Sequence, residues 1–564
     1  MKIILSVIFC IIALYVFYLE TFEAKQYEQM AESQHTFQLP LLAERGKIFD
    51  CQDRPIVYNQ MTASIRILPQ YVRPSAIDSV ANLLAQYNLK PKNEILHELR
   101  TRRSLYWFKK NIDYQVACSL KQKLRKCKFD NSVIVADAIR RIYPFSEILA
   151  SVTGFVGDEA GLAGIEYRYD SILKGTEGYI VLQKDASGNN FAWSSYPTKK
   201  PINGQDIVLT INLDIQDIAY RELANYVNRF KALRGQVIVL NAQDAALLAL
   251  AEYPDYDPHQ PTQFSQELWK AASISDEFEP GSVYKLLICA TALESPNRDL
   301  LINQKYDVSN GFITISGKKI KDVHNNGILD FPGIFIKSSN IGVSLLSQLV
   351  SPKDFFLKQR EFGFGMPTGI ELPGEAAGYI DKPANLKPLR FANIAFGQGV
   401  RVTLLQLAMA YLSIANDGEL LKPYLVKEIR NQNKVVMCNK RTVVRRVLSS
   451  ENAQIIKEIL AGVVNQGTGR AAALSGFQVC GKTGTAQKIE PNGTYSATRS
   501  VMTFIGFFPK ENPKYLIAVM IDEPKISRFA GEVTCPLYRS IAEQIIQLDN
   551  PHYKPNANLL TMNQ

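Results

Sequence analysis

Residues 277–295, EFEPGSVYKLLICATALES, place a serine and a lysine at the head of an apolar stretch. Pro280 and Gly281 indicate a turn, and the apolar run after them predicts a buried helix that begins near Ser282. Lys285 follows Ser282 by three positions, so a helix would place the hydroxyl and the amine on one face. A lysine whose pKa is lowered can take the proton of a serine, and free N–H groups at a helix start can stabilise an oxyanion. The pattern predicts a serine nucleophile, although on its own it is more typical of a helix cap with a surface lysine.

A second polar group begins another apolar, helix-like stretch at residues 333–349, GIFIKSSNIGVSLLSQL. The hydroxyl of Ser338 could relay a proton between the lysine and a leaving group. The amide of Asn340 could hold both the lysine and a substrate carbonyl. Taken alone, this run is typical of an ordinary helix N-cap.

A third group lies in the β-like run GFQVCGKTGTAQKI, residues 476–489. A strand with a free edge can pair with an extended peptide, and Gly484 would let the substrate backbone approach closely. Lys482 would supply a positive charge for a terminal carboxylate and help to lower the pKa of Lys285. A phosphate-binding loop is disfavoured, because the run lacks the preceding strand and the following helix that such a loop requires.

Together and in this order, Ser-x-x-Lys, Ser-x-Asn and Lys-Thr-Gly are the signature of penicillin-binding proteins and serine β-lactamases. Over nearly its whole length the chain resembles a class B penicillin-binding protein, and most closely the division-specific, FtsI-type transpeptidase. The stretches that carry the resemblance are RGKIFD, RIYP, GIE, EPGSVYK, HNNG, KSSNIG, FGFGMPTGIELPGE, AFGQGVRVTLLQLA, NQGTGRAAALSGFQVCGKTGTAQK and FIGFFP.

The resemblance implies an α/β (α+β) fold, in which a transpeptidase domain of the serine β-lactamase-like type has a five-stranded sheet flanked by helices. An elongated, mixed β-rich pedestal domain and a single N-terminal transmembrane helix would precede it. The expected divisions are a cytoplasmic tip with the anchor (1–22), the pedestal of dimerisation type (23–205), the transpeptidase domain (206–548) and a C-terminal tail (549–564).

The resemblance also implies roles for the motif residues. Ser282 would attack the penultimate D-Ala carbonyl of a peptidoglycan stem peptide, and the acyl group would pass to an amine of a neighbouring stem. Lys285 would be the general base, Ser338 the proton relay and Asn340 the orienting residue. Lys482 would be the fifth catalytic residue, and the substrate-binding residues would be Thr483, Gly484 and Thr485. Lys482 and Thr485 would receive the donor carboxylate, and the N–H groups of Ser282 and Thr485 would form the oxyanion hole. No metal or cofactor is implied, and β-lactams would trap Ser282.

The segment from Ile3 to Leu19 carries no charged residue, which is at the short end of a membrane-spanning helix. A cleaved signal peptide is the alternative, but no small-x-small cleavage site follows the run. Lys2 precedes the run and Glu20 follows it, so the positive-inside rule predicts a cytoplasmic N-terminus. The chain would be a single-pass protein of the inner membrane with its catalytic domain periplasmic or extracellular, and a polar helical stalk would extend to about Leu39.

The composition limits the possible partners. The 564 residues are 46% hydrophobic, and the formal net charge of +10 is not concentrated in a run that would bind nucleic acid. Eight cysteines without a Cys-x-x-Cys pair and only five histidines disfavour zinc and dithiol sites. The partners that the resemblance implies are stem peptides, β-lactams, the membrane, a SEDS-type glycosyltransferase and other division proteins.

Apolar spacing predicts helices over about 75–130, with the basic residues of 100–110 on them. A strand and a helix are expected over 207–227, and a hairpin of two buried strands over 235–256. Several functions remain as alternatives: an elongation-type class B transpeptidase, a D,D-carboxypeptidase, a β-lactamase-like hydrolase or sensor, and an inactive scaffold that only binds division partners.

Overall fold

The computed structural model describes residues 2–25, 27, 30, 36–158, 160–184, 190–191, 197–385 and 387–554. These residues form two compact units whose segments alternate along the chain. Unit 1 comprises Met1–Gly46, Asn59–Arg141 and Ser171–Gln205, and unit 2 comprises Lys47–Tyr58, Ile142–Asp170 and Asp206–Gln564.

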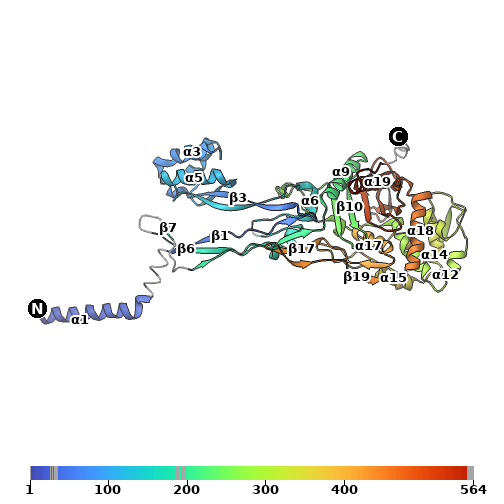
Figure 1. Ribbon diagram of the computed structural model, residues 1–564, viewed down its shortest axis with the longest axis horizontal. Coiled ribbons are helices and arrows are strands. Elements are labelled where there is room, and N and C mark those ends of the chain that lie inside the picture. The colour runs from blue at the N-terminus through green and yellow to red at the C-terminus, as the bar shows by residue number, and fades with distance from the viewer. Residues whose placement is uncertain are drawn as a thin grey trace. The chain divides into compact units, whose positions relative to one another are not determined.

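The N-terminal apolar segment is helical. Helix α1 (Lys2–Tyr18) continues into a π-helical turn, η1 (Leu19–Glu23), and the stretch Ile3–Glu23 is long and apolar enough to cross a membrane (Figure 1). None of that stretch is buried against the rest of the chain. The stalk expected up to Leu39 falls partly outside the described residues, and its last residues form strand β1 (Thr36–Leu41) instead of a helix.

Unit 1 contains a small sheet and a helical module. Strand β1 pairs antiparallel with β6, and β6 also pairs with β7 and β8. The helices α3, α4 and α5 pack their apolar faces on β3 and β4 around one core. Besides α1 and η1, the elements of unit 1 are β1, the larger part of β3 (Pro55–Ile67), α3 (Ile77–Gln86), α4 (Lys92–Thr101), β4 (Tyr106–Asp113), α5 (Tyr114–Lys126), β5 (Val133–Ile142) but for its last residue, α8 (Asp170–Leu173) but for its first residue, β6 (Gly178–Lys184), β7 (Asn190–Phe191) and β8 (Thr198–Lys199).

The helical expectation for 75–130 was wrong at residues 106–113, which form strand β4. Tyr106 and Phe108 are buried while Trp107 and Lys109 are exposed, so the side chains alternate with a period of two. Lys109 and Lys110 therefore lie on a strand that pairs with β3, not on a helix.

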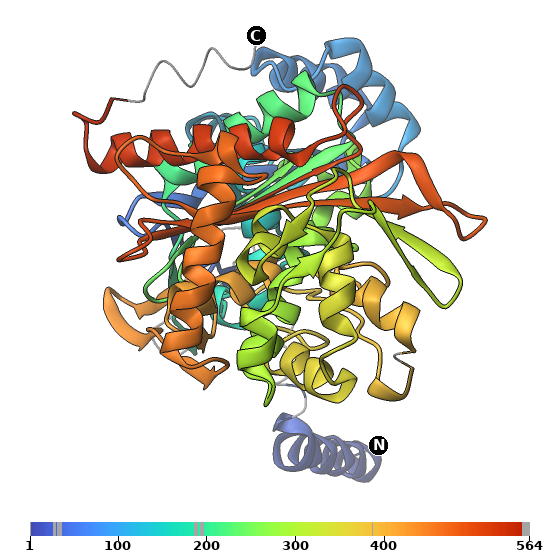
Figure 2. The ribbon, with the colours of Figure 1, turned by 90° about the vertical axis from the view of Figure 1, so that its right-hand side faces the viewer.

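Unit 2 is built on a five-stranded antiparallel sheet in the order β11-β10-β22-β21-β20. Strands β10 (Arg234–Asn241) and β11 (Leu247–Tyr253) form the expected hairpin, and β20 (Cys480–Ile489), β21 (Tyr495–Phe508) and β22 (Tyr515–Asp522) complete the sheet. Helices α9 (Leu213–Arg229) and α19 (Ala530–Asp549) cover one face, and Figure 2 shows α19, in red, lying along the sheet. Helix α17 (Leu404–Ala415) packs against β10, β21 and β22, and α18 (Ser450–Gln466) packs against β20.

The remaining elements of unit 2 surround this sheet. A second sheet has the order β18-β17-β9-β2, and β2 pairs with the first residues of β3. The elements are β2 (Ile48–Phe49), α6 (Ser146–Thr153), α7 (Gly164–Arg168), β9 (Asp206–Leu209), α10 (Ala272–Ser275), α11 (Lys285–Leu293), α12 (Arg298–Asn303), β12 (Tyr306–Asp307), β13 (Phe312–Ile315), β14 (Lys318–Lys321), β15 (Ile328–Leu329), α13 (Phe331–Ile336), α14 (Asn340–Ser347), α15 (Pro352–Glu361), α16 (Pro388–Ala395), β16 (Glu419–Leu421), β17 (Val426–Asn431), β18 (Lys434–Cys438) and β19 (Val443–Arg446).

Candidate active site

Ser282 lies in a short 3-10 turn, η6 (Gly281–Tyr284), directly before the buried helix α11. Tyr411 of α17 stabilises this turn, because its hydroxyl donates to the carbonyl of Val283 at 2.8 Å. The Ser282 side chain is half-buried, and within the part of the chain that the structure describes its hydroxyl makes no hydrogen bond. Its oxygen is therefore free to attack a substrate.

Two lysine amines meet at Ser338. Lys285 donates from Nζ to the carbonyl oxygen of Ser338 at 2.6 Å and to its Oγ at 3.3 Å. Lys482 donates from Nζ to the same Oγ at 2.9 Å. The two lysines are only 1% and 2% exposed. The structure thus brings one residue from each of the three motifs into a single hydrogen-bonded cluster.

Burial and mutual repulsion change the titration of both amines. The loss of hydration lowers the pKa of Lys285 well below its ordinary value, and the positive charge of Lys482 lowers it further, while Asp322 opposes this. Burial lowers the pKa of Lys482 to about 7, with an opposing contribution from Cys535. Two ammonium groups so close together in a buried site repel each other, so one of the amines gives up its proton near neutral pH. A neutral amine next to Ser338 can accept a proton.

The backbone at Ser338 adopts the left-handed conformation, with φ +59°. The next residue, Ser339, is the N-cap of α14, and its Oγ accepts from the N–H of Gly342 at 2.8 Å. Asn340 is the first helical residue, and its Nδ2 donates to the carbonyl of Lys321 at 3.2 Å. In the structure Asn340 is therefore held by the strand β14, whereas Ser338 holds the lysines.

Sequence reasoning missed Asp322, which contacts the second motif from the loop after β14. Its carboxylate accepts from Ser339 Oγ at 2.6 Å and from the N–H groups of Asn340 and Ile341 at 2.5 and 3.0 Å. The sequence feature that could have indicated Asp322 is its position two residues before the HNNG stretch. No local periodicity links Asp322 to the serines, so only the tertiary contact reveals it.

Strand β20 carries the third motif at the edge of the five-stranded sheet. It pairs with β21, and its other edge faces no strand of the described chain. A Cβ built on Gly281 would lie 2.7 Å from the Thr485 carbonyl oxygen, so this carbonyl faces the turn that holds Ser282. In an antiparallel strand the N–H and C=O of one residue face the same side, so the Thr485 N–H also faces that edge.

Glycine is required where β20 passes η6. A Cβ at Gly484 would lie 2.3 Å from Thr503 Oγ1 and 2.9 Å from the carbonyl oxygen of Pro280. Beside it, the Thr483 side chain is buried with its Oγ1 2.6 Å from Thr468 Oγ1, while Thr485 is exposed. The close approach keeps β20 next to the turn of Ser282.

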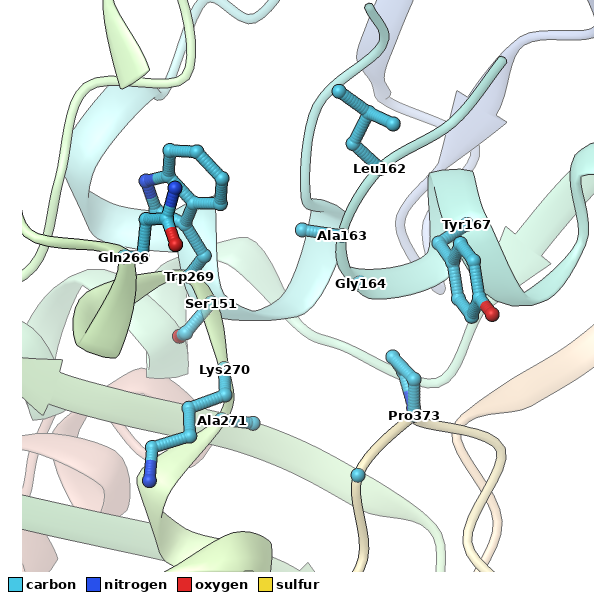
Figure 3. Close-up of a pocket in the computed structure, with 11 residues that line it drawn as sticks. Ser151, Leu162, Ala163, Gly164, Tyr167, Gln266, Trp269, Lys270, Ala271 and Pro373 are labelled. Atoms are coloured by element: carbon cyan, nitrogen blue, oxygen red, sulfur yellow. The ribbon is translucent and has the colours of Figure 1, made fainter. Parts of the chain in front are cut away.

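Two cavities differ in their relation to these residues. One cavity of about 500 Å³ opens beside the C-terminal half of β20. Its lining includes Gln487 of that strand and Glu279, which lies three positions before Ser282. The other, of about 230 Å³, has Trp269 on one side and Tyr167 and Pro373 on the other (Figure 3). No motif residue lines the second cavity, so it is not part of the candidate active site.

A metal centre has no support among the residues that the structure describes, since no three His, Cys, Asp or Glu side chains gather there. The groups available for chemistry are a hydroxyl, two buried amines, a carboxylate and backbone N–H groups. This set suits acyl transfer through a serine ester.

Comparisons with known proteins agree with this chemistry. Residues 235–543 match the family described as Penicillin binding protein transpeptidase domain, and residues 40–209 match Penicillin-binding Protein dimerisation domain. The chain is 31% identical over 533 residues to "Probable peptidoglycan D,D-transpeptidase PenA" of Neisseria meningitidis, covering 93% of this chain and 88% of the relative. It is 31% identical over 499 residues to "Penicillin-binding protein PbpB" of Mycobacterium tuberculosis, covering 85% and 71% of the two chains.

Solved structures show the same fold. Penicillin binding protein 3 from Mycobacterium tuberculosis, complexed with aztreonam, superposes with a TM-score of 0.70 at 27% identity, covering 91% of this chain and 97% of that one. Penicillin Binding Protein 2X from Streptococcus thermophilus has a TM-score of 0.75 at 22% identity, which shows the fold alone, over 92% and 83% of the two chains.

These matches confirm the expected α/β transpeptidase fold and the dimerisation-type domain before it. They also confirm that the chain is an enzyme of the transpeptidase type. The chain belongs to the class B penicillin-binding proteins, the peptidoglycan D,D-transpeptidases that carry a dimerisation domain ahead of the catalytic one.

Proposed function

We propose that Ser282 is the nucleophile of this D,D-transpeptidase and that a donor stem peptide acylates it. The observation that carries the proposal is the meeting of two buried lysine amines at Ser338, with Lys285 directly after the turn that holds Ser282. As Ser282 Oγ bonds to the penultimate D-Ala carbonyl carbon, its proton passes to the neutral amine of Lys285. When the peptide bond breaks, Ser338 relays that proton from Lys285 to the departing D-Ala. An acceptor amine later attacks the ester carbonyl, the bond to Ser282 Oγ breaks, and a proton of the amine passes through Lys285 back to Ser282 Oγ.

The edge of β20 supports the binding of an extended donor peptide. Because the Thr485 N–H faces the turn of Ser282, it and the Ser282 N–H form the proposed oxyanion hole. Lys482, Thr483, Gly484 and Thr485 lie on one edge strand next to Ser282, so we propose that they bind the donor and its terminal carboxylate. Asn340 is proposed to orient the substrate.

β-Lactams resemble the D-Ala-D-Ala end, and we propose that they acylate Ser282. Fluorescent penicillin tests this directly on the purified full chain in detergent. We expect stoichiometric covalent labelling of the wild-type protein and none of Ser282→Ala. Equal labelling of the two proteins, or no labelling of either, would refute the assignment of Ser282 as the nucleophile. Release of free D-Ala without a cross-linked product, in the presence of an acceptor stem, would instead indicate a D,D-carboxypeptidase.

We further propose a septal role in cell division, with an elongation-type role as the alternative. The support is the resemblance of the KSSNIG, KTGTAQK and FIGFFP stretches to division-type enzymes. A SEDS-type glycosyltransferase and other division proteins are the proposed partners. Depletion of the protein in its host should produce filaments and fewer cross-linked muropeptides, whereas spherical cells would indicate the elongation role.

The proposed topology places residues 1–22 as tip and anchor, with the pedestal (23–205), the transpeptidase domain (206–548) and the tail (549–564) outside the inner membrane. The apolar helix Ile3–Glu23 supports an anchor, and Lys2 ahead of it supports a cytoplasmic N-terminus. A reporter that works only in the cytoplasm, fused after Gln60, should be inactive. An active reporter would contradict this orientation.

A further inference from the structure

Asp322 lies in the loop between β14 and β15, outside all three motifs, yet its carboxylate contacts the last two residues of the second motif and the residue after them. Oδ2 accepts from Ser339 Oγ, and Oδ1 accepts from the N–H groups of Asn340 and Ile341. Hydrogen bonds to an ionised carboxylate are stronger than those between neutral groups. The three bonds therefore fix the start of α14 relative to β14.

We propose that Asp322 is a positioning residue of the active site, whose carboxylate holds the turn at Ser338 so that its carbonyl and hydroxyl face both lysine amines. The inference rests on the proposed function, because it assigns Asp322 a role in the acylation of Ser282. Asp322 itself does not touch the proposed reacting atoms. It acts through Ser339 and Asn340, the neighbours of Ser338.

The conformation of Ser338 explains why such support is needed. A non-glycine residue at φ +59° costs roughly 1–3 kcal/mol and persists only where its surroundings hold it in place. Ser338 is followed directly by the residues that Asp322 binds, so a loose helix start would let the turn relax. The Ser338 carbonyl would then move away from Lys285, to which it now lies at 2.6 Å.

The charge of Asp322 also bears on the base. The charged groups that act on Lys285 are Lys482 from β20, which disfavours its protonation, and Asp322, which favours it. Replacing Asp322 by asparagine removes the negative charge and keeps an oxygen that can accept from the two N–H groups, whereas its amide nitrogen cannot accept from Ser339 Oγ. Lys285 should then lose its proton at lower pH, while two of the three positioning hydrogen bonds remain.

The test compares the rate of acylation by fluorescent penicillin for the wild-type chain, Asp322→Ala, Asp322→Asn and Asp322→Glu. Asp330→Ala is the matched control, because Asp330 also accepts a backbone N–H at a helix start: it is the N-cap of α13 and accepts from the Gly333 N–H at 2.8 Å. We expect Asp322→Ala to acylate about 10- to 100-fold more slowly, corresponding to the loss of a hydrogen bond to a charged group. Asp322→Glu should recover part of the rate, and Asp330→Ala should stay within about twofold of the wild type.

The pH profile and folding separate this role from a purely structural one. In Asp322→Asn the acid limb of the acylation profile should shift to lower pH, at a thermal midpoint close to that of the wild type. The inference is overturned if Asp322→Ala acylates at the wild-type rate, if Asp330→Ala is slowed equally, or if the rates only follow the folded fraction with no shift of the acid limb. A wild-type chain that takes up no label overturns the proposed function and this inference with it.

Discussion

At the scale of single residues, Lys285 is the group on which the proposed chemistry depends most. It is fully buried, and its amine donates to two atoms of Ser338. Lys285→Ala removes the base, and Lys285→Arg replaces it by a guanidinium that does not lose its proton. Both variants should slow acylation by about 10²- to 10⁴-fold, measured as the rate of penicillin labelling.

Lys305→Ala serves as the control for this prediction, since Lys305 lies outside the lysine cluster and should leave the rate unchanged. Retention of the wild-type acylation rate by folded Lys285→Arg would mean that another group takes the serine proton.

The lowered lysine pKa values predict a pH dependence of acylation. Burial lowers the pKa of Lys482 to about 7, and burial and the charge of Lys482 lower that of Lys285. The acylation rate should therefore fall as the pH drops below about 7, because protonation of this coupled pair leaves fewer sites with a neutral amine that can accept the serine proton. Rates measured between pH 5 and 9 check this, and a flat profile would contradict it.

A second variant tests the direction of the coupling. The charge of Lys482 lowers the pKa of Lys285, so Lys482→Met should let that pKa rise. The acid limb of the residual activity should then move to higher pH. A limb that moves to lower pH would show that the two amines do not repel each other as the structure indicates.

At the scale of secondary-structure elements, the loop after α16 holds the turn of Ser282. Gly397 has φ +88°, its carbonyl accepts from the Gly281 N–H at 3.0 Å, and a Cβ on it would lie 2.0 Å from the Gly281 oxygen. Gly493 in the β20–β21 hairpin has φ +80° and nothing within 4 Å of such a Cβ. Gly397→Ala should therefore lower the free energy of unfolding by at least about 2 kcal/mol more than Gly493→Ala.

Denaturant unfolding of the two variants measures this difference, and penicillin labelling should be slower in Gly397→Ala alone. Equal destabilisation would show that the backbone strain of a positive φ dominates and that the contact with η6 is unimportant.

The edge strand β20 permits a substitution that central strands do not tolerate. Because the Thr485 N–H faces away from β21, proline at this position removes no hydrogen bond of the sheet. Thr485→Pro should fold but acylate about 10²- to 10³-fold more slowly, since it lacks one proposed oxyanion donor. Thr485→Val retains the N–H, so its acylation rate should fall much less. Similar acylation rates for the two variants would show that the Thr485 N–H is not an oxyanion donor.

At the scale of the whole molecule, none of the apolar helix Ile3–Glu23 is buried against the rest of the chain. Deleting residues 2–35 should therefore leave both cores intact and release the protein from the membrane fraction into the soluble one. Its acylation rate by penicillin in solution should stay within about twofold of the full chain. A truncated protein that fails to fold would show that the segment contributes to the fold as well as to anchoring.

Much of the fold could be read from local patterns. The continuous apolar run of β10 and β11 predicted a buried hairpin, and the unbroken apolar residues after Lys285 predicted the buried helix α11. Local patterns failed at β4, where a short run of aromatic and basic residues satisfies both helical and strand spacing. Pairing with β3 decided the outcome there, because tertiary contacts override weak local preference.

The sequence by itself determined the family, since three motifs in a set order, and many further stretches, agree with one architecture. Only the tertiary structure decided how those motifs meet. Ser338 lies 53 positions from Lys285 and 144 from Lys482, and sequence spacing carries no distance across such long connections. The same folding brings Asp322 onto the start of α14 and turns the Thr485 N–H toward Ser282. Residue types name the available chemistry, but packing of distant segments sets the distances and charges on which that chemistry depends.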